Sequence, residues 1–278
     1  MSGGRIEVHW PAADAAVPGL VHVVLRHEGR LNAMTRAMWR ELRAVFERIQ
    51  ADPAARCVLV EGADGAFCAG GDISEYPAFR FDPAELRDFH ESDVWGGLAA
   101  MRQCDVPIVA AIAGACMGAG VEIASCCDLR IAAADARFGA PIARLGFPMA
   151  PREAALVAGA VGETVARQML LEAATFDAAQ MLGCGFLSRV AQPGQLAAEA
   201  LASARRIARL APGAARMNKQ TLRALSAMKS PFSGAGAGLG AIEKEDQGMA
   251  EPDPYAYADS AEHREGITAF LAKRAPVF

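Results

Sequence analysis

The segment that decides the fold reads Gly65-Ala66-Phe67-Cys68-Ala69-Gly70-Gly71-Asp72-Ile73. It follows a short apolar run, Cys57 to Val60, which has the length and composition of a buried strand. Two adjacent glycines after a strand let the backbone turn tightly and point its N–H groups outward. The segment is therefore predicted to form a turn that can bind an oxyanion.

A second turn of the same kind reads Gly114-Ala115-Cys116-Met117-Gly118-Ala119-Gly120-Val121-Glu122. It follows the apolar run Pro107 to Ile112 and opens a helix, whose N-terminus offers unpaired N–H groups and a favourable dipole. Either turn alone is common in structural strand-to-helix connections, so the prediction depends on the pair. Neither turn matches a phosphate-binding loop or a dinucleotide fingerprint, which disfavours nucleotide binding.

The segments around these turns predict an α/β core. Two paired strands are expected at residues 6–10 and 20–25, and the apolar spacing over residues 35–50 predicts an amphipathic helix with Thr35 as its N-cap. Residues 80–103 are polar at first and helical later, which favours a mobile cover that helps to build the pocket walls. In such a core the functional loops lie at the carboxyl ends of the strands.

The chain changes character after Ala191. Helical patterns are expected at residues 196–210, 214–228, 239–249 and 260–273, interrupted by prolines, and residues 233–240 form a short glycine-rich loop. We therefore predict a core at residues 1–194 and a C-terminal helical region at residues 195–278.

The composition of the 278 residues is that of an ordinary globular protein, with 53% hydrophobic and 22% charged residues and a net charge of -4. This mild charge gives no reason to expect nucleic acid or an anionic membrane as a partner. No apolar stretch reaches membrane-spanning length and the N-terminus has no signal-like segment, so a cytoplasmic location is expected. The seven cysteines have no metal-like spacing, and Cys68 is interpreted as a small core residue because no histidine lies near it in sequence.

Beyond the two turns, the chain ends in Glu265-Gly266-Ile267-Thr268-Ala269-Phe270-Leu271-Ala272-Lys273-Arg274-Ala275-Pro276-Val277-Phe278. This ending, the two turns and the blocks at residues 30–34, 107–111 and 127–132, which occur in the same order, resemble the crotonase superfamily of enoyl-CoA hydratases and isomerases. The resemblance extends over nearly the whole chain. The resemblance implies a spiral of ββα units with a C-terminal helical trimerisation region, and a trimer or a dimer of trimers. It also implies an acyl-CoA substrate, with no metal and no cofactor besides the coenzyme A thioester.

Carried over residue by residue, the resemblance implies that the N–H groups of Gly71 and Ala119 form an oxyanion hole for the thioester carbonyl. Preorganised donors suit this chemistry, because an enolate concentrates charge on one oxygen. Ala69 would contact the adenine, and Arg30 would line the coenzyme A channel. The C-terminal pair Lys273 and Arg274 would lie near phosphates of coenzyme A, bound either by the same subunit or by a neighbouring one. Alternatively, all three cations are solvated surface charge.

Glu122 matches the first of two glutamates with which hydratases position and activate water. Ile142 stands where the second glutamate is found in hydratases, and an aliphatic side chain cannot donate a proton. Glu153 is interpreted as a first-turn helix residue rather than a relocated acid, while Asp72 and Glu75 are expected to cap. Arg144 either faces the acyl group, pairs with a buried carboxylate, or is solvated at the surface.

The sequence therefore predicts an acyl-CoA-processing enzyme, with reversible water addition to a 2-enoyl-CoA as the leading reaction. Isomerase, decarboxylase and thioesterase reactions stay open, because these enzymes share the oxyanion hole and differ in the second acid. A weakly catalytic acyl-CoA-binding protein is the alternative from another class, and Ile142 is the residue that motivates it.

Overall fold

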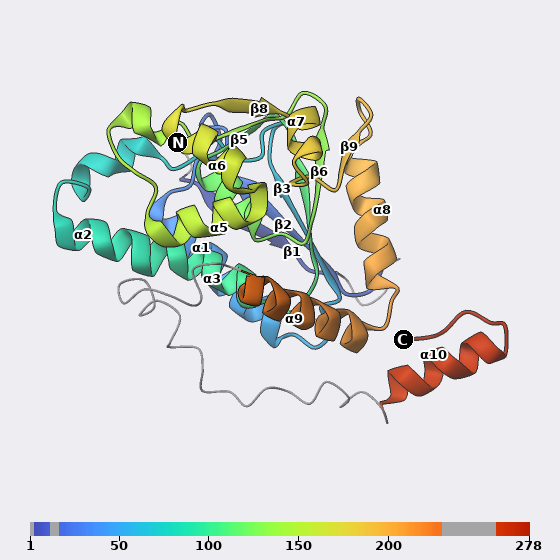
Figure 1. Cartoon of the computed structure of the whole chain (residues 1–278). Helices are drawn as coiled ribbons and strands as arrows, with labels where there is room; N and C mark the ends of the chain where they lie inside the picture. The colour runs from blue at the N-terminus through green and yellow to red at the C-terminus, as the bar shows by residue number, and fades with distance from the viewer. Residues whose placement is uncertain (1–2, 12–16, 230–259) are drawn as a thin grey trace. The chain divides into compact units, whose positions relative to one another are not determined.

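The computed structural model describes residues 3–11, 17–229 and 260–278 of the chain. The chain divides into two compact units, Met1–Ala208 and Arg209–Phe278. Each unit is described by itself, and Figure 1 shows the elements of both.

The first unit is built on a six-stranded sheet with the order β1-β2-β3-β4-β6-β9. β1 and β2 are antiparallel, and the other neighbours in this sheet are parallel. A second sheet has the order β5-β7-β8, and its strand β5 is part of the second glycine-rich segment (Figure 1). The strands of the two sheets are β1 (Arg5–His9), β2 (Leu20–Arg26), β3 (Cys57–Gly62), β4 (Ile108–Ile112), β5 (Ala115–Met117), β6 (Leu129–Ala133), β7 (Arg137–Gly139), β8 (Thr175–Asp177) and β9 (Arg189–Ala191).

Both faces of the large sheet are buried, which explains why its central strands are continuously apolar. Val58 and Val60 of β3 pack in the core cluster that includes helix α1 (Arg36–Ala51), and alternate residues of β3 face the other way. On that opposite face Leu59 joins a cluster with helix α8 (Leu196–Ala208), which contributes alanines at a spacing of four. Small alanines let a helix approach a sheet closely, so α1 and α8 enclose the sheet between them.

Helix α1 begins as the sequence predicts, because the Thr35 side chain caps it by accepting a hydrogen bond from the Met38 N–H. It packs beside a helical run made of α2 (Pro83–Asp88), the π-helical η2 (Phe89–Val94) and α3 (Trp95–Gln103). The run is tied to α1 by Asp93, a buried carboxylate that accepts from Arg36 at 2.7 Å and Arg40 at 2.6 Å. The predicted mobile cover therefore has a helical structure fixed to α1 by ion pairs, and its motion stays a prediction.

The first unit has six more helical segments in its described residues, of which η1 follows β3 and the others follow β5. They are η1 (Ile73–Ala78), α4 (Ala119–Ser125), η3 (Ile142–Leu145), α5 (Pro151–Val161), α6 (Glu163–Leu171) and α7 (Ala178–Gly183). Helices α4 and α5 pack against each other, as do α5 and α6. The second glycine-rich turn thus leads directly into a helix that contacts α5.

The second unit contains α9 (Pro212–Lys229) and α10 (Ala261–Leu271), which agree with two of the helices expected in the C-terminal region. Within this unit Glu262 of α10 accepts a hydrogen bond from the Gly213 N–H of α9 at 2.9 Å. The helix expected at residues 239–249 and the glycine-rich loop at 233–240 lie outside the described residues. Helix α8 packs on the sheet of the first unit, while the predicted domain boundary at residue 194 stays a prediction.

No helix in the described ranges is long and apolar enough to cross a membrane. The seven cysteines are all free thiols, six of them buried and Cys184 exposed.

Asn32 ties the loop after β2 to the first glycine-rich turn. Its Nδ2 donates to the carbonyl oxygens of Ala63 and Ala66, each at 2.8 Å, and its Oδ1 accepts from the His27 N–H at 3.0 Å. The side chain is buried, and its backbone φ of 60° lies in the left-handed region that asparagine tolerates better than most residues. One amide therefore satisfies two carbonyls and one N–H that are remote from each other in sequence.

We expect the Asn32→Ala substitution to lower the free energy of unfolding by about 2 to 4 kcal/mol, because it leaves these three groups without their partner. Urea denaturation measures the change. The neighbouring Leu31→Ala is the control, since Leu31 is also left-handed but its side chain is 58% exposed. Similar stabilities of the two variants would contradict this role of Asn32.

Candidate active site

A backbone β-bridge to Met34 holds the first glycine-rich turn at Gly71. The Met34 N–H donates to the Gly70 carbonyl and the Met34 carbonyl accepts from the Asp72 N–H, both at 2.8 Å. Because Met34 uses the groups on either side of Gly71, the N–H of Gly71 itself points away from Met34. The bridge therefore fixes the direction of one predicted oxyanion donor.

The second turn runs beside the first at backbone distance. The backbones of Cys116 and Cys68 form an isolated parallel β-bridge, and the Met117 N–H donates to the Cys68 carbonyl at 2.8 Å. A Cβ atom added to Gly118 would lie 3.7 Å from the Gly70 Cα, and one added to Gly120 only 2.5 Å from the Cys68 carbonyl oxygen. Gly118 also has a φ of 48°, where a side chain would be strained. Gly120 is thus required by the close approach of two backbones, and Gly118 by its left-handed backbone conformation.

This approach brings the Gly71 and Ala119 N–H groups onto adjacent segments. Ala119 is the first residue of α4, whose leading N–H groups have no partner within the helix. Within the described part of the chain, neither the Gly71 nor the Ala119 N–H donates a hydrogen bond to another residue. Two free donors on neighbouring turns can bind one oxygen that carries negative charge.

Glu122 lies one turn into α4 and is 9% exposed. Burial, and after it the nearby charge of Glu153, raises the pKa of its carboxyl group from the ordinary value of 4.5 to about 8. A protonated Glu122 at neutral pH can donate a proton, which its ordinary pKa would not allow.

The burial of Glu153 beside Glu122 was not predicted from the sequence. Glu153 lies in the first turn of α5, as predicted, but its side chain is 2% exposed and close enough to Glu122 to raise its pKa. The ring Nδ1 of His90, in η2, lies 3.2 Å from its Oε1. The only signal in the sequence is Pro151, which marks the start of the helix but not the side that Glu153 faces.

The structure also places the other polar candidates. Asp72 caps η1 by accepting from the Ser74 N–H at 3.0 Å, as predicted, and Glu75 accepts from the Arg36 N–H. Arg144 is exposed and donates to the Ala173 carbonyl, so it is a surface residue. Ile142 begins η3 and is half-buried.

The remaining candidates are the buried thiol of Cys68 and groups of side chains that could hold a metal. Burial raises the pKa of the Cys68 thiol to about 12, so Cys68 is uncharged at neutral pH and is a core residue, as interpreted from the sequence. No group of three or more potential metal ligands is found within residues 3–11, 17–229 and 260–278.

An aromatic wall stands next to Gly71. A Cβ atom on Gly71 would overlap the hydroxyl of Tyr76, so this hydroxyl lies against the turn. The Tyr76 ring packs edge-on against Phe79, Phe89 and Phe147, with ring centroids about 6 Å apart. Burial raises the pKa of Tyr76 to about 12, so its hydroxyl stays protonated and can donate a hydrogen bond.

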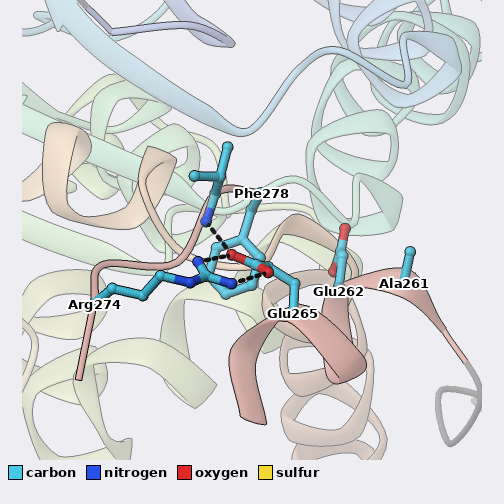
Figure 2. A pocket seen from close by; sticks show the side chains of 6 residues that line it. Ala261, Glu262, Glu265, Arg274 and Phe278 are labelled. Carbon is cyan, nitrogen blue, oxygen red and sulfur yellow. Dashed lines mark hydrogen bonds and ion pairs between the residues drawn. The ribbon is translucent and has the colours of Figure 1, made fainter. Parts of the chain in front are cut away.

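The residues that the sequence assigned to coenzyme A lie in both units. Ala69, in the first turn, donates its N–H to the Leu31 carbonyl at 2.9 Å, and Arg30 is exposed in the preceding loop. In the second unit Arg274 forms a two-pronged ion pair with Glu265, at 2.6 and 2.8 Å, while Lys273 is exposed. Figure 2 shows this ion pair at the rim of a pocket of about 480 Å³ that Phe278 also lines. The contacts of all four residues with coenzyme A stay predictions.

Comparison with known proteins agrees with this geometry. A family model described as enoyl-CoA hydratase/isomerase matches residues 16–278. A probable enoyl-CoA hydratase of Mycobacterium tuberculosis, echA8, is 33% identical over 257 residues, which cover 92% of this chain and 93% of that protein. A probable enoyl-CoA hydratase of Rhizobium meliloti is 34% identical over 200 residues, or 72% and 76% of the two chains.

A solved structure of this family is similar to the chain as well. The crystal structure of an enoyl-CoA hydratase/carnithine racemase from Magnetospirillum magneticum is similar with a TM-score of 0.82 and 33% sequence identity. The match covers 94% of this chain and 92% of that structure. The crotonase-like α/β fold predicted from the sequence is therefore confirmed.

We expect Gly120→Ala to destabilise the protein by about 1 to 3 kcal/mol, because the added methyl meets a backbone carbonyl that cannot move aside. Thermal unfolding measures this. Gly159→Ala in α5 is the matched control, since nothing lies within 4 Å of its added Cβ, and it should raise stability by about 0.4 to 1 kcal/mol. Equal effects of the two variants would contradict the close approach of the two turns.

The buried carboxyl of Glu122 gives a second prediction. Carbon-13 NMR of labelled glutamate should show one carboxyl that titrates near pH 8 and is absent in Glu122→Gln, and Glu153→Gln should lower this midpoint. Because the folded pKa lies above the ordinary value of 4.5, the contribution of Glu122 to stability is full below pH 4.5 and is lost as the pH rises through 8. A midpoint near 4.5 would mean that Glu122 is solvated.

Proposed function

The chain belongs to the enoyl-CoA hydratase/isomerase family of the crotonase superfamily, and from this premise we propose that it adds water reversibly to a 2-enoyl-CoA. The observation that carries the proposal is Glu153, a buried carboxylate held by His90 and close to Glu122. It supplies a second carboxyl group although Ile142 occupies the position where hydratases have one. An acyl-CoA-binding protein without catalysis would have no use for two buried carboxyl groups beside an oxyanion hole.

Glu122 and Glu153 are two buried carboxyl groups close to each other, and burial together with the charge of Glu153 raises the pKa of Glu122. The N–H of the His90 ring stabilises negative charge on Glu153, whereas burial favours the protonated form of Glu122. Glu122 is then the acid and Glu153 the base of the pair. This division of roles follows from the two surroundings, which are burial for Glu122 and the contact with the His90 ring for Glu153.

The reaction uses the two turns and this pair together. The thioester oxygen accepts hydrogen bonds from the Gly71 and Ala119 N–H groups, which draws electron density from the conjugated double bond. Water attacks the β-carbon and gives a proton to Glu153, and the negative charge collects on the thioester oxygen. Glu122 then protonates the α-carbon, and the proton returns from Glu153 to Glu122, so that the pair is restored.

Binding of coenzyme A completes the proposal. Ala69 contacts the adenine, Arg30 lines the channel, and Lys273 and Arg274 approach the phosphates. Arg274 can do so only if its ion pair with Glu265 opens or if Glu265 faces away from the phosphate, because the pair now occupies its guanidinium. We also propose a trimer or a dimer of trimers, in keeping with the sequence resemblance, and light scattering after size exclusion tests it.

We predict that Glu122→Gln and Glu153→Gln each lower kcat for crotonyl-CoA hydration by ~10²- to 10⁴-fold, because each removes a proton-transfer group. Loss of the conjugated thioester absorbance measures the rate, and NMR of the 3-hydroxyacyl product identifies the reaction. Glu163→Gln is the matched control, since Glu163 is also a first-turn glutamate, in α6, but its side chain is 75% exposed.

Three results would exclude the proposal. Undiminished hydration by Glu153→Gln would mean that Glu153 is not the base. Migration of a 3-enoyl double bond without water addition would identify an isomerase. Acyl-CoA binding with no loss of absorbance at high protein concentration would identify the binding protein.

A further inference from the structure

Arg80 differs from the other half-buried cations near the site. Its guanidinium carbon lies 3.7 Å from the centre of the Phe147 ring and 4.6 Å from the centre of the Tyr76 ring. The centres of these two rings are themselves 6.0 Å apart and the rings meet edge to face. The guanidinium is therefore positioned by two aromatic side chains from separate segments, η1 and the loop after η3.

No acidic or carbonyl group in the described part of the chain accepts a hydrogen bond from the Arg80 guanidinium. Arg36 shows the contrast, because it contacts the same aromatic cluster but forms ion pairs with Asp93 at 2.7 Å and Asp88 at 2.9 Å. Burial also lowers the pKa of Arg80, which indicates that its charge is partly removed from water. A partly desolvated guanidinium with free donors is suited to bind an anion.

Tyr76 connects Arg80 with the oxyanion hole. The Tyr76 hydroxyl lies against Gly71, and the Tyr76 carbonyl accepts from the Arg80 N–H at 2.9 Å. The Arg80 guanidinium contacts the ring of the same tyrosine, 4.6 Å from the ring centre. Arg80 is therefore separated from the Gly71 donor by one aromatic side chain, within reach of the far end of a short acyl chain that starts at Gly71.

We propose that Arg80 binds a carboxylate at the distal end of the acyl chain, so that the substrate is a short unsaturated dicarboxylic acyl thioester. The inference rests on the proposed function, because the acyl chain is taken to start at the Gly71 and Ala119 donors. The planar guanidinium can bind both carboxylate oxygens, and the aromatic wall suits a flat conjugated chain. Anionic groups of coenzyme A itself share this chemistry and are separated by the experiment.

The test compares saturated thioesters, which bind but cannot be hydrated. Calorimetry should show that the wild-type protein binds glutaryl-CoA about 10- to 100-fold more tightly than pentanoyl-CoA, as a charge-assisted pair would give. Arg80→Met should abolish this preference and leave the affinity for pentanoyl-CoA within about twofold. Arg80→Lys should keep part of the preference for glutaryl-CoA, since lysine retains the positive charge but lacks the planar guanidinium that binds two carboxylate oxygens. Arg48→Met is the control, because Arg48 is stacked on Trp10 and is exposed.

The outcomes separate this inference from the proposed function. Equal affinities for the two thioesters in the wild-type protein overturn the role of Arg80. Equal weakening of both thioesters by Arg80→Met assigns Arg80 to coenzyme A and also overturns it. A preference for glutaryl-CoA that Arg80→Met removes, together with no hydration of glutaconyl-CoA, supports the carboxylate site and overturns the hydratase proposal instead.

Discussion

The contact between two glycine-rich turns is the constraint on which the rest of this structure depends. The backbones of Cys68 and Cys116 form a β-bridge, and no side chain would fit at position 120 against the Cys68 carbonyl. Because backbone meets backbone, small shifts cannot be absorbed by side-chain rotation. Met34 fixes the first turn from the opposite side, so the free N–H groups of Gly71 and Ala119 are set by main-chain geometry. The oxyanion hole proposed for these two groups would need no rearrangement when charge develops.

The same contact determines the environment of the acidic residues. Helix α4 starts at the second turn and carries Glu122 into the interior, where α5 packs on α4 and brings Glu153 beside it. His90, from the helical run that is anchored to α1, completes this arrangement. In the proposed site, Glu122 is one carboxyl group, Ile142 stands where the resemblance leads us to expect the other, and Glu153 supplies a second carboxyl group from the neighbouring helix α5.

Sequence reasoning identified the features that depend on local chemistry. The two turns, the capping of α1 by Thr35 and the capping by Asp72 follow from residue type and spacing, and all are present. The family resemblance gave the fold, which periodicity alone could not distinguish from other α/β arrangements. Glu153 was interpreted by its place in a helix turn, but whether a first-turn residue faces water or the interior depends on which helix packs against it. The position of Arg80 between two aromatic rings depends in the same way on segments distant in sequence.

The central claim is that one thioester oxygen is held by the Gly71 and Ala119 N–H groups while the acyl carbons face two carboxyl groups. A crystal structure with bound acetoacetyl-CoA, an unreactive 3-oxoacyl thioester, tests it most directly. We expect the thioester oxygen to lie about 2.7 to 3.1 Å from the backbone nitrogens of Gly71 and Ala119, with Glu122 and Glu153 flanking the α- and β-carbons. A thioester oxygen bound away from either nitrogen, or a Glu153 side chain turned away from the acyl group, would contradict it.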